Sequence, residues 1–223
     1  MTGYYKPEDC ISFLRGIMTN YVLVHGGHND GGVWDKVVPY LKKEGHTVFA
    51  PTLGDPDKTT LDGHISEVCA LVEKNGLDQV ILAGHSYASM VITGTAARLP
   101  DRIACLVYLD SAIPKSGDSL FGIMERCGAG PEKFGLAREQ PFVDPLFFDE
   151  ETIRKIPKIY VHCLKSEFLA VGKCAYADVL RHASQDHWTY YELDSVHYCM
   201  KAVPEQVAAI LLGKTSRARE TGK

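Results

Sequence analysis

Short apolar segments alternate with helical segments along almost the whole sequence. Apolar residues recur at helical spacing around 34–45, 65–76, 86–99 and 204–212. Between and around these helices, the segments predicted as buried strands are 21–24, 47–53, 79–83, 103–109, 158–163 and 189–193. Continuous apolar strands that alternate with helices indicate a parallel sheet with both faces covered. The pattern therefore predicts an α/β fold with a doubly wound, mostly parallel sheet.

The length and composition fit one large domain. The chain has 223 residues, of which 45% are hydrophobic and 23% charged, so it can bury a sizeable core. We therefore expect a single domain over residues 1–223. The segment of about 114–157 breaks the alternation with glycine, proline and charge, and is predicted as a small insertion over the sheet edge. The polar tail of about 214–223 is predicted to fray.

The charge and the cysteine content argue against several classes of function. A net charge of −4 gives no basic surface for nucleic acid or an anionic membrane. The sequence contains no apolar run of about 18 residues, the length needed to span a bilayer. The N-terminus lacks the basic and apolar regions of a secretory signal. The seven cysteines are odd in number and form no CxxC motif. We therefore expect a cytoplasmic protein with reduced thiols and no zinc or iron–sulfur site.

The most specific motif is Gly84-His85-Ser86-Tyr87-Ala88, which follows a predicted strand and opens a predicted helix. A serine at such a junction is typical of a nucleophile elbow, in which the hydroxyl projects above the sheet. Small residues two positions before and after the serine let strand and helix approach; here they are Gly84 and Ala88. Glycine is usual at the second position, so Ala88 is a departure. The alternative is that Ser86 only caps a buried helix.

A serine nucleophile needs a general base and two N–H donors for the oxyanion. His197 is the leading candidate for the base, because it follows the last predicted strand and comes after Ser86 in the chain. The predicted oxyanion donors are the backbone N–H groups of Tyr87 and Gly27, although the glycine could simply build a tight turn. We expect His28, next to that turn, to line the pocket.

No cofactor or metal is expected. A metal pair of His25 and His28 would lack a third ligand. The glycine-rich turn 26–32 has neither of the spacings that bind phosphate groups of nucleotides.

The sequence resembles the α/β-hydrolase superfamily along nearly its whole length. The resemblance rests on HGGHNDGGVWDKVVPYLKKEGHTVFAPTL, GHSYASMV, LVYLDSAIP and the HYCM…PEQVAAIL segment, in this order. These segments are similar to a branch of plant methylesterases, hydroxynitrile lyases and bacterial esterases of the pyrethroid-hydrolase type. The resemblance implies a cofactor-free serine carboxylesterase that cleaves small carboxylic esters through an acyl-enzyme on Ser86. It does not identify the substrate.

More than one residue is a candidate for the acid that orients His197. Relatives of the methylesterase type carry an aspartate shortly after the strand that reads KIYVHCLK here, and this place holds Ser166 followed by Glu167. We expect Glu167 to be the acid. Asp110 is the rival, because the acid can come from the end of another strand. Asp194 lies only three residues before His197 and is disfavoured, while a weak or absent acid stays open.

Two other functions stay open. A hydroxynitrile lyase is disfavoured, because the threonine and the lysine of that group are matched here by Gly27 and Tyr198. A non-catalytic ligand-binding or scaffold protein on the same fold is the second alternative. The expected partner is a small-molecule ester, with no nucleic acid and no membrane, and a homodimer stays open. The insertion is shorter than the helical cap of the relatives, which predicts a more open site.

Overall fold

The computed structural model describes residues 18–182 and 186–215. The N-terminal segment examined for a secretory signal, Cys10 and nearly all of the predicted tail lie outside the described residues. Within the described part of the chain, no helix is both long and apolar enough to cross a membrane.

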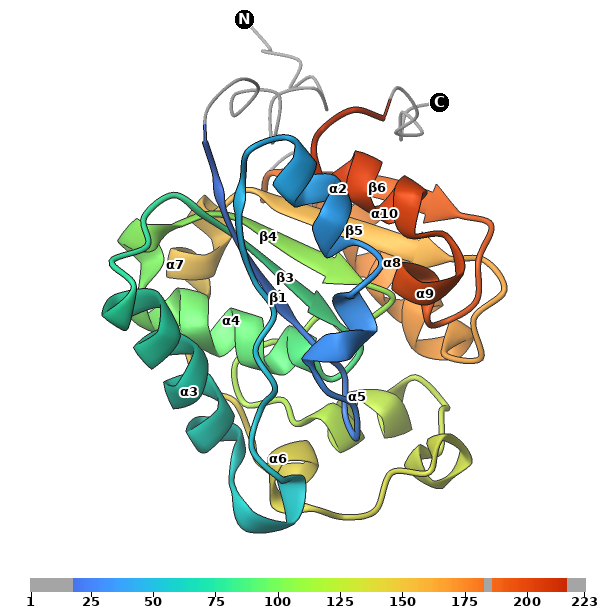
Figure 1. Cartoon of the computed structure of the whole chain (residues 1–223). Coiled ribbons are helices and arrows are strands. Elements are labelled where there is room, and N and C mark those ends of the chain that lie inside the picture. The colour runs from blue at the N-terminus through green and yellow to red at the C-terminus, as the bar shows by residue number, and fades with distance from the viewer. Residues whose placement is uncertain (1–17, 183–185, 216–223) are drawn as a thin grey trace, which may run out of the picture.

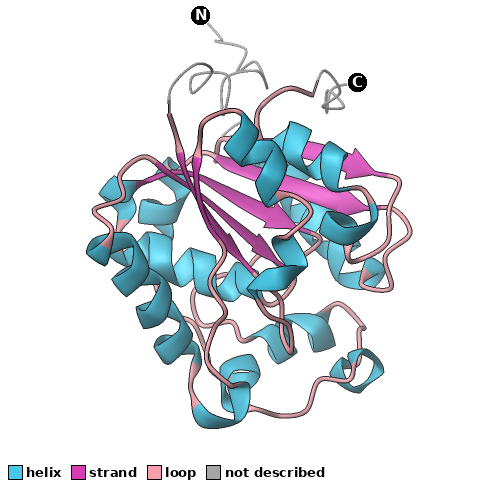
Figure 2. Cartoon of the chain, viewed as in Figure 1, coloured by secondary structure: helices cyan, strands magenta, loops and turns pink. Residues whose placement is uncertain are grey.

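Six strands of the described chain form one parallel sheet (Figure 2), as the apolar segments predict. Their order is β2-β1-β3-β4-β5-β6, and every neighbouring pair is parallel. The residues that follow the strands therefore gather along one edge of the sheet, where α/β proteins bind their ligands. The strands are β1 Asn20–Val24, β2 Thr47–Phe49, β3 Val80–His85, β4 Ile103–Leu109, β5 Lys158–Cys163 and β6 Trp188–Leu193.

Helices cover both faces of the sheet (Figure 1), and each face has its own apolar core. Alternate residues of β1 point to opposite cores: Val22 and Val24 to one, Tyr21 and Leu23 to the other. The first core is closed by α3 Leu61–Lys74, α4 Ala88–Arg98 and α8 Leu169–His182. The second core is closed by α2 Val38–Lys43, α9 Cys199–Ala202 and α10 Pro204–Leu211.

The helix predicted over 34–45 is shorter and broken in the structure. A 3₁₀ helix, η1 Gly31–Trp34, ends before α2 begins at Val38. Pro39 explains the break, because it has no N–H to continue an α-helix from the preceding turn but fits the first turn of a new one. The apolar spacing was still informative, since Trp34 and Leu41 are fully buried.

The helix α8 was not predicted from the sequence. Its buried residues Val171, Ala175 and Val179 recur every four positions, which is helical spacing. Gly172 lies within this run and weakens the signal, since glycine disfavours a helix interior. A Cβ at Gly172 would lie 3.4 Å from Nε2 of His162, which is ordinary van der Waals contact, so the space there does not require a glycine. The spacing of the three apolar residues could have revealed the helix.

The segment between β4 and β5 holds short helices rather than a large cap. Two of them, α5 and α6, lie beyond the carboxyl ends of β1 and β3 (Figure 1), while α7 contacts α4. These elements are α5 Leu120–Arg126, η4 Pro131–Phe134, α6 Gln140–Val143 and α7 Glu150–Lys155. The remaining 3₁₀ helices are η2 Pro56–Lys58 and η3 Pro100–Arg102.

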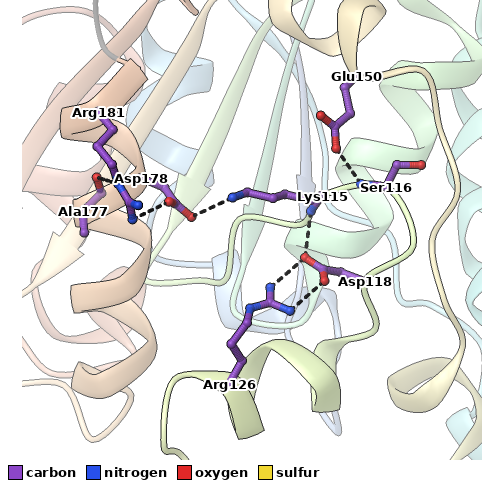
Figure 3. A network of polar contacts seen from close by, with 8 residues as sticks. All are labelled: Lys115, Ser116, Asp118, Arg126, Glu150, Ala177, Asp178 and Arg181. Atoms are coloured by element: carbon purple, nitrogen blue, oxygen red, sulfur yellow. Dashed lines mark hydrogen bonds and ion pairs between the residues drawn. The ribbon is translucent and has the colours of Figure 1, made fainter.

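Charged contacts fasten the start of this insertion to its surroundings (Figure 3). The Arg126 guanidinium on α5 donates to both carboxylate oxygens of Asp118, at 2.9 Å each. The same carboxylate accepts the Lys115 backbone N–H at 3.0 Å, and the Lys115 ammonium lies 3.9 Å from the Asp178 carboxylate on α8. The chain that leaves β4 is thus tied to both α5 and α8.

Candidate active site

Ser86 lies at the turn between β3 and α4, in the context that the sequence predicts. Its φ is 55°, in the left-handed region that a non-glycine residue rarely adopts. Its N–H donates to the Leu109 carbonyl at 3.1 Å, which fixes the turn against the end of β4. A Cβ at Gly84 would lie 2.9 Å from the Ala88 carbonyl oxygen, so this close crossing of strand and helix requires glycine. Backbone strain held by the surrounding structure is common at functional sites.

His197 is paired with Asp110. The Nδ1 atom of His197 lies 2.6 Å from Oδ2 of Asp110. The Asp110 carboxylate is fully buried, whereas the His197 side chain keeps 13% of its surface exposed. With Nδ1 engaged by the carboxylate, Nε2 is left to exchange a proton with a substrate or a nucleophile.

The end of β4 is built to hold the Asp110 carboxylate. Asp110 also has a left-handed backbone, with φ 43°, and its N–H donates to the Val161 carbonyl at 2.8 Å. Its Oδ1 accepts the Cys163 N–H at 3.2 Å, and its Oδ2 accepts the Ser166 hydroxyl. The Ser166 Oγ also lies 3.5 Å from His197 Nδ1. Three donors therefore converge on one buried carboxylate and fix its orientation.

The structure corrects the expectation that Glu167 meets the histidine. Glu167 is exposed, whereas its neighbour Ser166 is buried and points to Asp110. The Phe168 N–H donates to Ser166 Oγ at 2.9 Å, so the turn places Ser166 inward and Glu167 outward. Asp194 lies at the surface and pairs with Lys165 at 2.8 Å. The rival candidate, Asp110, is the carboxylate at the histidine.

His85 joins the histidine loop to the elbow. It donates from Nε2 to the His197 carbonyl at 3.0 Å, and the two rings lie 4.4 Å apart. Burial, and to a lesser extent the nearby His197, hold the pKa of His85 well below its ordinary value. A neutral His85 therefore positions His197 beside the elbow that carries Ser86. From the sequence His85 was only the variable residue of the motif, because its partner lies 112 residues away.

The glycine-rich turn after β1 lies against the elbow. A Cβ on Gly26 would come within 3.2 Å of Ser86 Cβ. His25 fixes this turn, because its ring contacts the Gly26 carbonyl at 2.8 Å and accepts the Leu53 N–H at 2.9 Å. Burial lowers the pKa of His25, in keeping with a neutral ring that donates from one nitrogen and accepts at the other. Gly27, which the sequence predicts as an oxyanion donor, directly follows Gly26 on this turn.

Tyr87 is held at the start of α4. Its hydroxyl lies 2.8 Å from His64 Nδ1, and His64 Nε2 lies 2.9 Å from the Gly54 carbonyl, so Tyr87 donates to the histidine. Neither Gly27 nor Tyr87 has a backbone N–H partner among the described residues. A cavity of about 100 Å³ is lined by both residues, together with His28 and His64.

His28 faces the insertion from the rim of this cavity. Its Nε2 lies 3.1 Å from Oε1 of Glu139, and its ring contacts the Phe142 ring edge-on at 5.5 Å. His28 has φ 54°, a strained backbone for a histidine. Glu139 was not predicted at this place, because nothing in the local sequence distinguishes it from the other charged residues of the insertion.

The remaining features of the described chain do not suggest a second catalytic centre. No group of three His, Cys, Asp or Glu side chains within residues 18–182 and 186–215 could hold a metal ion. A larger cavity of about 280 Å³ is lined by Lys158 and Trp188, which begin β5 and β6. It therefore lies at the amino ends of these strands, opposite the edge that carries His197 and Asp110.

The sequence matches the model of the alpha/beta hydrolase family over residues 21–216, and the chain belongs to that family. The parallel sheet with helices on both faces is the fold expected from the sequence.

Curated relatives are named as esterases and hydrolases. The carbendazim hydrolyzing esterase of Nocardioides sp. (strain SG-4G) is 42% identical over 117 residues, which are 49% of this chain and 48% of that protein. The pyrethroid hydrolase of Sphingobium wenxiniae is 33% identical over 107 residues, which are 45% of this chain and 38% of that protein. The matches thus span about half the length of these relatives or less. Their names fit the branch that the motifs resemble.

Solved structures agree on the fold over most of the chain. The structure of polyneuridine aldehyde esterase aligns with a TM-score of 0.70 and 20% identity, covering 87% of this chain and 98% of that one. An extracellular α/β-hydrolase from a Paenibacillus species aligns with a TM-score of 0.67 and 20% identity, covering 89% of this chain and 100% of that one.

Proposed function

We propose that the protein is a serine carboxylesterase that cleaves small carboxylic esters through an acyl-enzyme on Ser86. The observation that carries the proposal is the contact of 2.6 Å between His197 and the buried Asp110, next to a strained serine turn. An aspartate that orients a histidine beside a serine is the arrangement of a catalytic triad. The esterase names of the relatives support the same class of reaction.

In the first half-reaction, Ser86 Oγ attacks the carbonyl carbon of the ester and His197 Nε2 takes its proton. The charge that develops on His197 is stabilised by Asp110. The N–H groups of Gly27 and Tyr87 hold the tetrahedral oxyanion. The bond to the alcohol oxygen then breaks, and His197 returns the proton to the leaving alcohol, which leaves the acyl group on Ser86.

In the second half-reaction, His197 takes a proton from a water molecule, and the oxygen of that water attacks the acyl carbon. Collapse of the second tetrahedral intermediate releases the carboxylic acid and returns the proton to Ser86. All steps use the same residues, and none requires a cofactor or a metal.

The test is hydrolysis of p-nitrophenyl esters with acyl chains of graded length, from acetate to dodecanoate, together with carbendazim and a pyrethroid. Wild type is compared with Ser86→Ala and with Ser89→Ala, which changes a buried serine three residues later, in the first turn of α4. We expect activity in wild type and Ser89→Ala and its loss in Ser86→Ala. Activity that survives in Ser86→Ala would refute the assignment of the nucleophile.

A fluorophosphonate probe distinguishes a non-catalytic protein from an esterase that accepts only a narrow range of substrates. The probe should label wild type and fail to label Ser86→Ala. A wild-type protein that neither hydrolyses any ester of the panel nor reacts with the probe would support ligand binding without catalysis.

A further inference from the structure

Ser166 lies beside both members of the acid–base pair, although the proposed mechanism gives it no chemical step. Its side chain is buried in the turn that follows β5. Its hydroxyl donates to Oδ2 of Asp110, the carboxylate oxygen that also faces His197 Nδ1 at 2.6 Å. The same Oγ lies 3.5 Å from His197 Nδ1. One buried hydroxyl group therefore contacts the acid at the oxygen that meets the base.

The direction of the Ser166 hydroxyl is set by the backbone of its own turn. A serine hydroxyl donates one hydrogen bond and can accept others. The Phe168 N–H donates to Ser166 Oγ at 2.9 Å, so the hydroxyl hydrogen is left to donate to Asp110. On the other side of the carboxylate, Oδ1 accepts the Cys163 N–H at 3.2 Å. The carboxylate is thus held through both oxygens, and rotation about its Cβ–Cγ bond would break these contacts.

The turn that carries Ser166 is itself fixed to the histidine and its loop. The Phe168 ring is almost fully buried, and its centre lies 5.3 Å from the centre of the His197 ring. The Lys165 N–H donates to the Ser195 carbonyl at 2.9 Å, which joins the turn to the loop between β6 and the histidine. A hydroxyl on such an anchored turn is already in place before the reaction begins.

We propose that Ser166 is a positioning residue, whose hydroxyl keeps Oδ2 of Asp110 turned toward His197. Without this donor the carboxylate is freer to rotate, and the histidine loses part of the support that fixes its tautomer and stabilises its charge. The loss falls on catalysis rather than on substrate binding, because Ser166 contacts the acid and does not line the cavity beside Gly27 and Tyr87. This inference rests on the proposed esterase function and adds a residue to its machinery.

The test removes the hydroxyl in two ways. Ser166→Ala deletes it, and Ser166→Cys replaces it with a thiol, which is only a weak donor. The matched control is Ser195→Ala, because Ser195 is also buried and its hydroxyl has no hydrogen-bond partner among the described residues. Denaturant unfolding of each variant identifies those that keep the fold, and the thiol variant serves if the alanine variant does not.

The kcat and KM values are measured with p-nitrophenyl acetate. We expect Ser166→Ala and Ser166→Cys to lower kcat by about tenfold or more, since a hydrogen bond to a charged group is lost or weakened. Their KM values should stay within about twofold of wild type, and Ser195→Ala should change neither constant by more than that. A kcat in the Ser166 variants equal to that of Ser195→Ala would overturn the inference. A loss confined to KM would also overturn it, because it would assign Ser166 to substrate binding.

A measurement without substrate separates this inference from the esterase proposal. The His197 Nδ1 proton is followed by proton NMR in wild type and in the three variants. A proton in a fixed hydrogen bond exchanges slowly with water and gives a sharp signal, whereas a loosened hydrogen bond broadens it. We expect a sharp signal in wild type and Ser195→Ala, and a broadened or lost signal in Ser166→Ala and Ser166→Cys.

The two measurements can fail independently. If wild type hydrolyses no ester, the esterase proposal fails, and the NMR comparison still decides whether Ser166 positions the acid. An equally sharp signal in Ser166→Ala, or no signal in wild type, would refute the positioning role.

Discussion

The ends of β4 and β5 are neighbours in the sheet, but the acidic residue at the end of β4 is buried, whereas the one at the end of β5 is exposed. At the end of β4, Asp110 is fully buried and accepts hydrogen bonds from backbone and side chain. At the end of β5, the turn buries Ser166 and exposes Glu167. Leu109 pairs with Val161 across the two strands, so the two ends lie side by side. The position of a strand end therefore does not suffice for a catalytic acid, because the turn must also direct the carboxylate inward.

The largest effect is expected from the inward carboxylate. Asp110→Asn should lower kcat by about 10³- to 10⁴-fold, because the amide cannot stabilise the charged His197 and favours the wrong tautomer. Glu167→Gln, the matched change on the neighbouring strand end, should alter kcat by less than about twofold, as for a surface substitution without buried partners. Ester hydrolysis by the purified variants measures both. A larger loss of kcat in Glu167→Gln than in Asp110→Asn would show that Glu167, and not Asp110, is the catalytic acid.

A second variant tests whether a carboxylate at the end of β5 can replace Asp110 as the acid. Ser166 Oγ lies 3.5 Å from His197 Nδ1, so a carboxylate at this position is within reach of the histidine. Adding Ser166→Asp to Asp110→Asn should therefore restore activity by about tenfold or more over Asp110→Asn alone. The kcat of the double variant measures the rescue. No gain over Asp110→Asn would show that the end of β5 cannot supply the acid.

Buried His85, which donates to the His197 carbonyl, should affect how the stability of the protein depends on pH. Burial lowers the pKa values of His85 and His25, so the unfolded chain binds more protons than the folded one below the ordinary histidine pKa of about 6.5. This contribution to stability is present above that pH and is lost as the pH falls. The free energy of unfolding, from urea denaturation at several pH values, should fall below about pH 6.5, and less steeply in His85→Gln. An identical slope in His85→Gln would contradict this role of His85.

A smaller effect is expected where the insertion leaves β4. Asp118→Ala removes the contacts with Arg126 and the Lys115 backbone (Figure 3), and should lower the free energy of unfolding by about 1 kcal/mol, since the arginine is largely exposed. Denaturant unfolding measures this change, with Glu132→Ala as the exposed control. An Asp118→Ala protein as stable as Glu132→Ala would show that these contacts do not fasten the insertion.

The elements that local sequence determines could be predicted. Continuous apolar runs identify the six strands, and the small residues around Ser86 identify the close crossing of β3 and α4. The break in the helix around Pro39 was missed, because the apolar spacing continues through it while the backbone hydrogen bonds do not.

The orientation of the acid could not be derived from the sequence alone. Asp110 and Glu167 both follow predicted strands, and the choice between them depends on contacts that Asp110 makes with Ser166, 56 residues away, and His197, 87 residues away. Glu139 was missed for the same reason, because its partner His28 follows β1, far from the insertion in the sequence. Such long-range pairing has no counterpart in local periodicity or in the strand–turn–helix motif.

The pairing of His197 with Asp110 is tested most directly by the proton NMR signal of the His197 Nδ1–H group. A proton held in a short hydrogen bond to a buried carboxylate resonates at low field, outside the range of ordinary amides. We expect this signal in wild type and in Glu167→Gln, and its absence in Asp110→Asn and His197→Gln. A low-field signal that persists in Asp110→Asn but disappears in Glu167→Gln would contradict the pairing of His197 with Asp110.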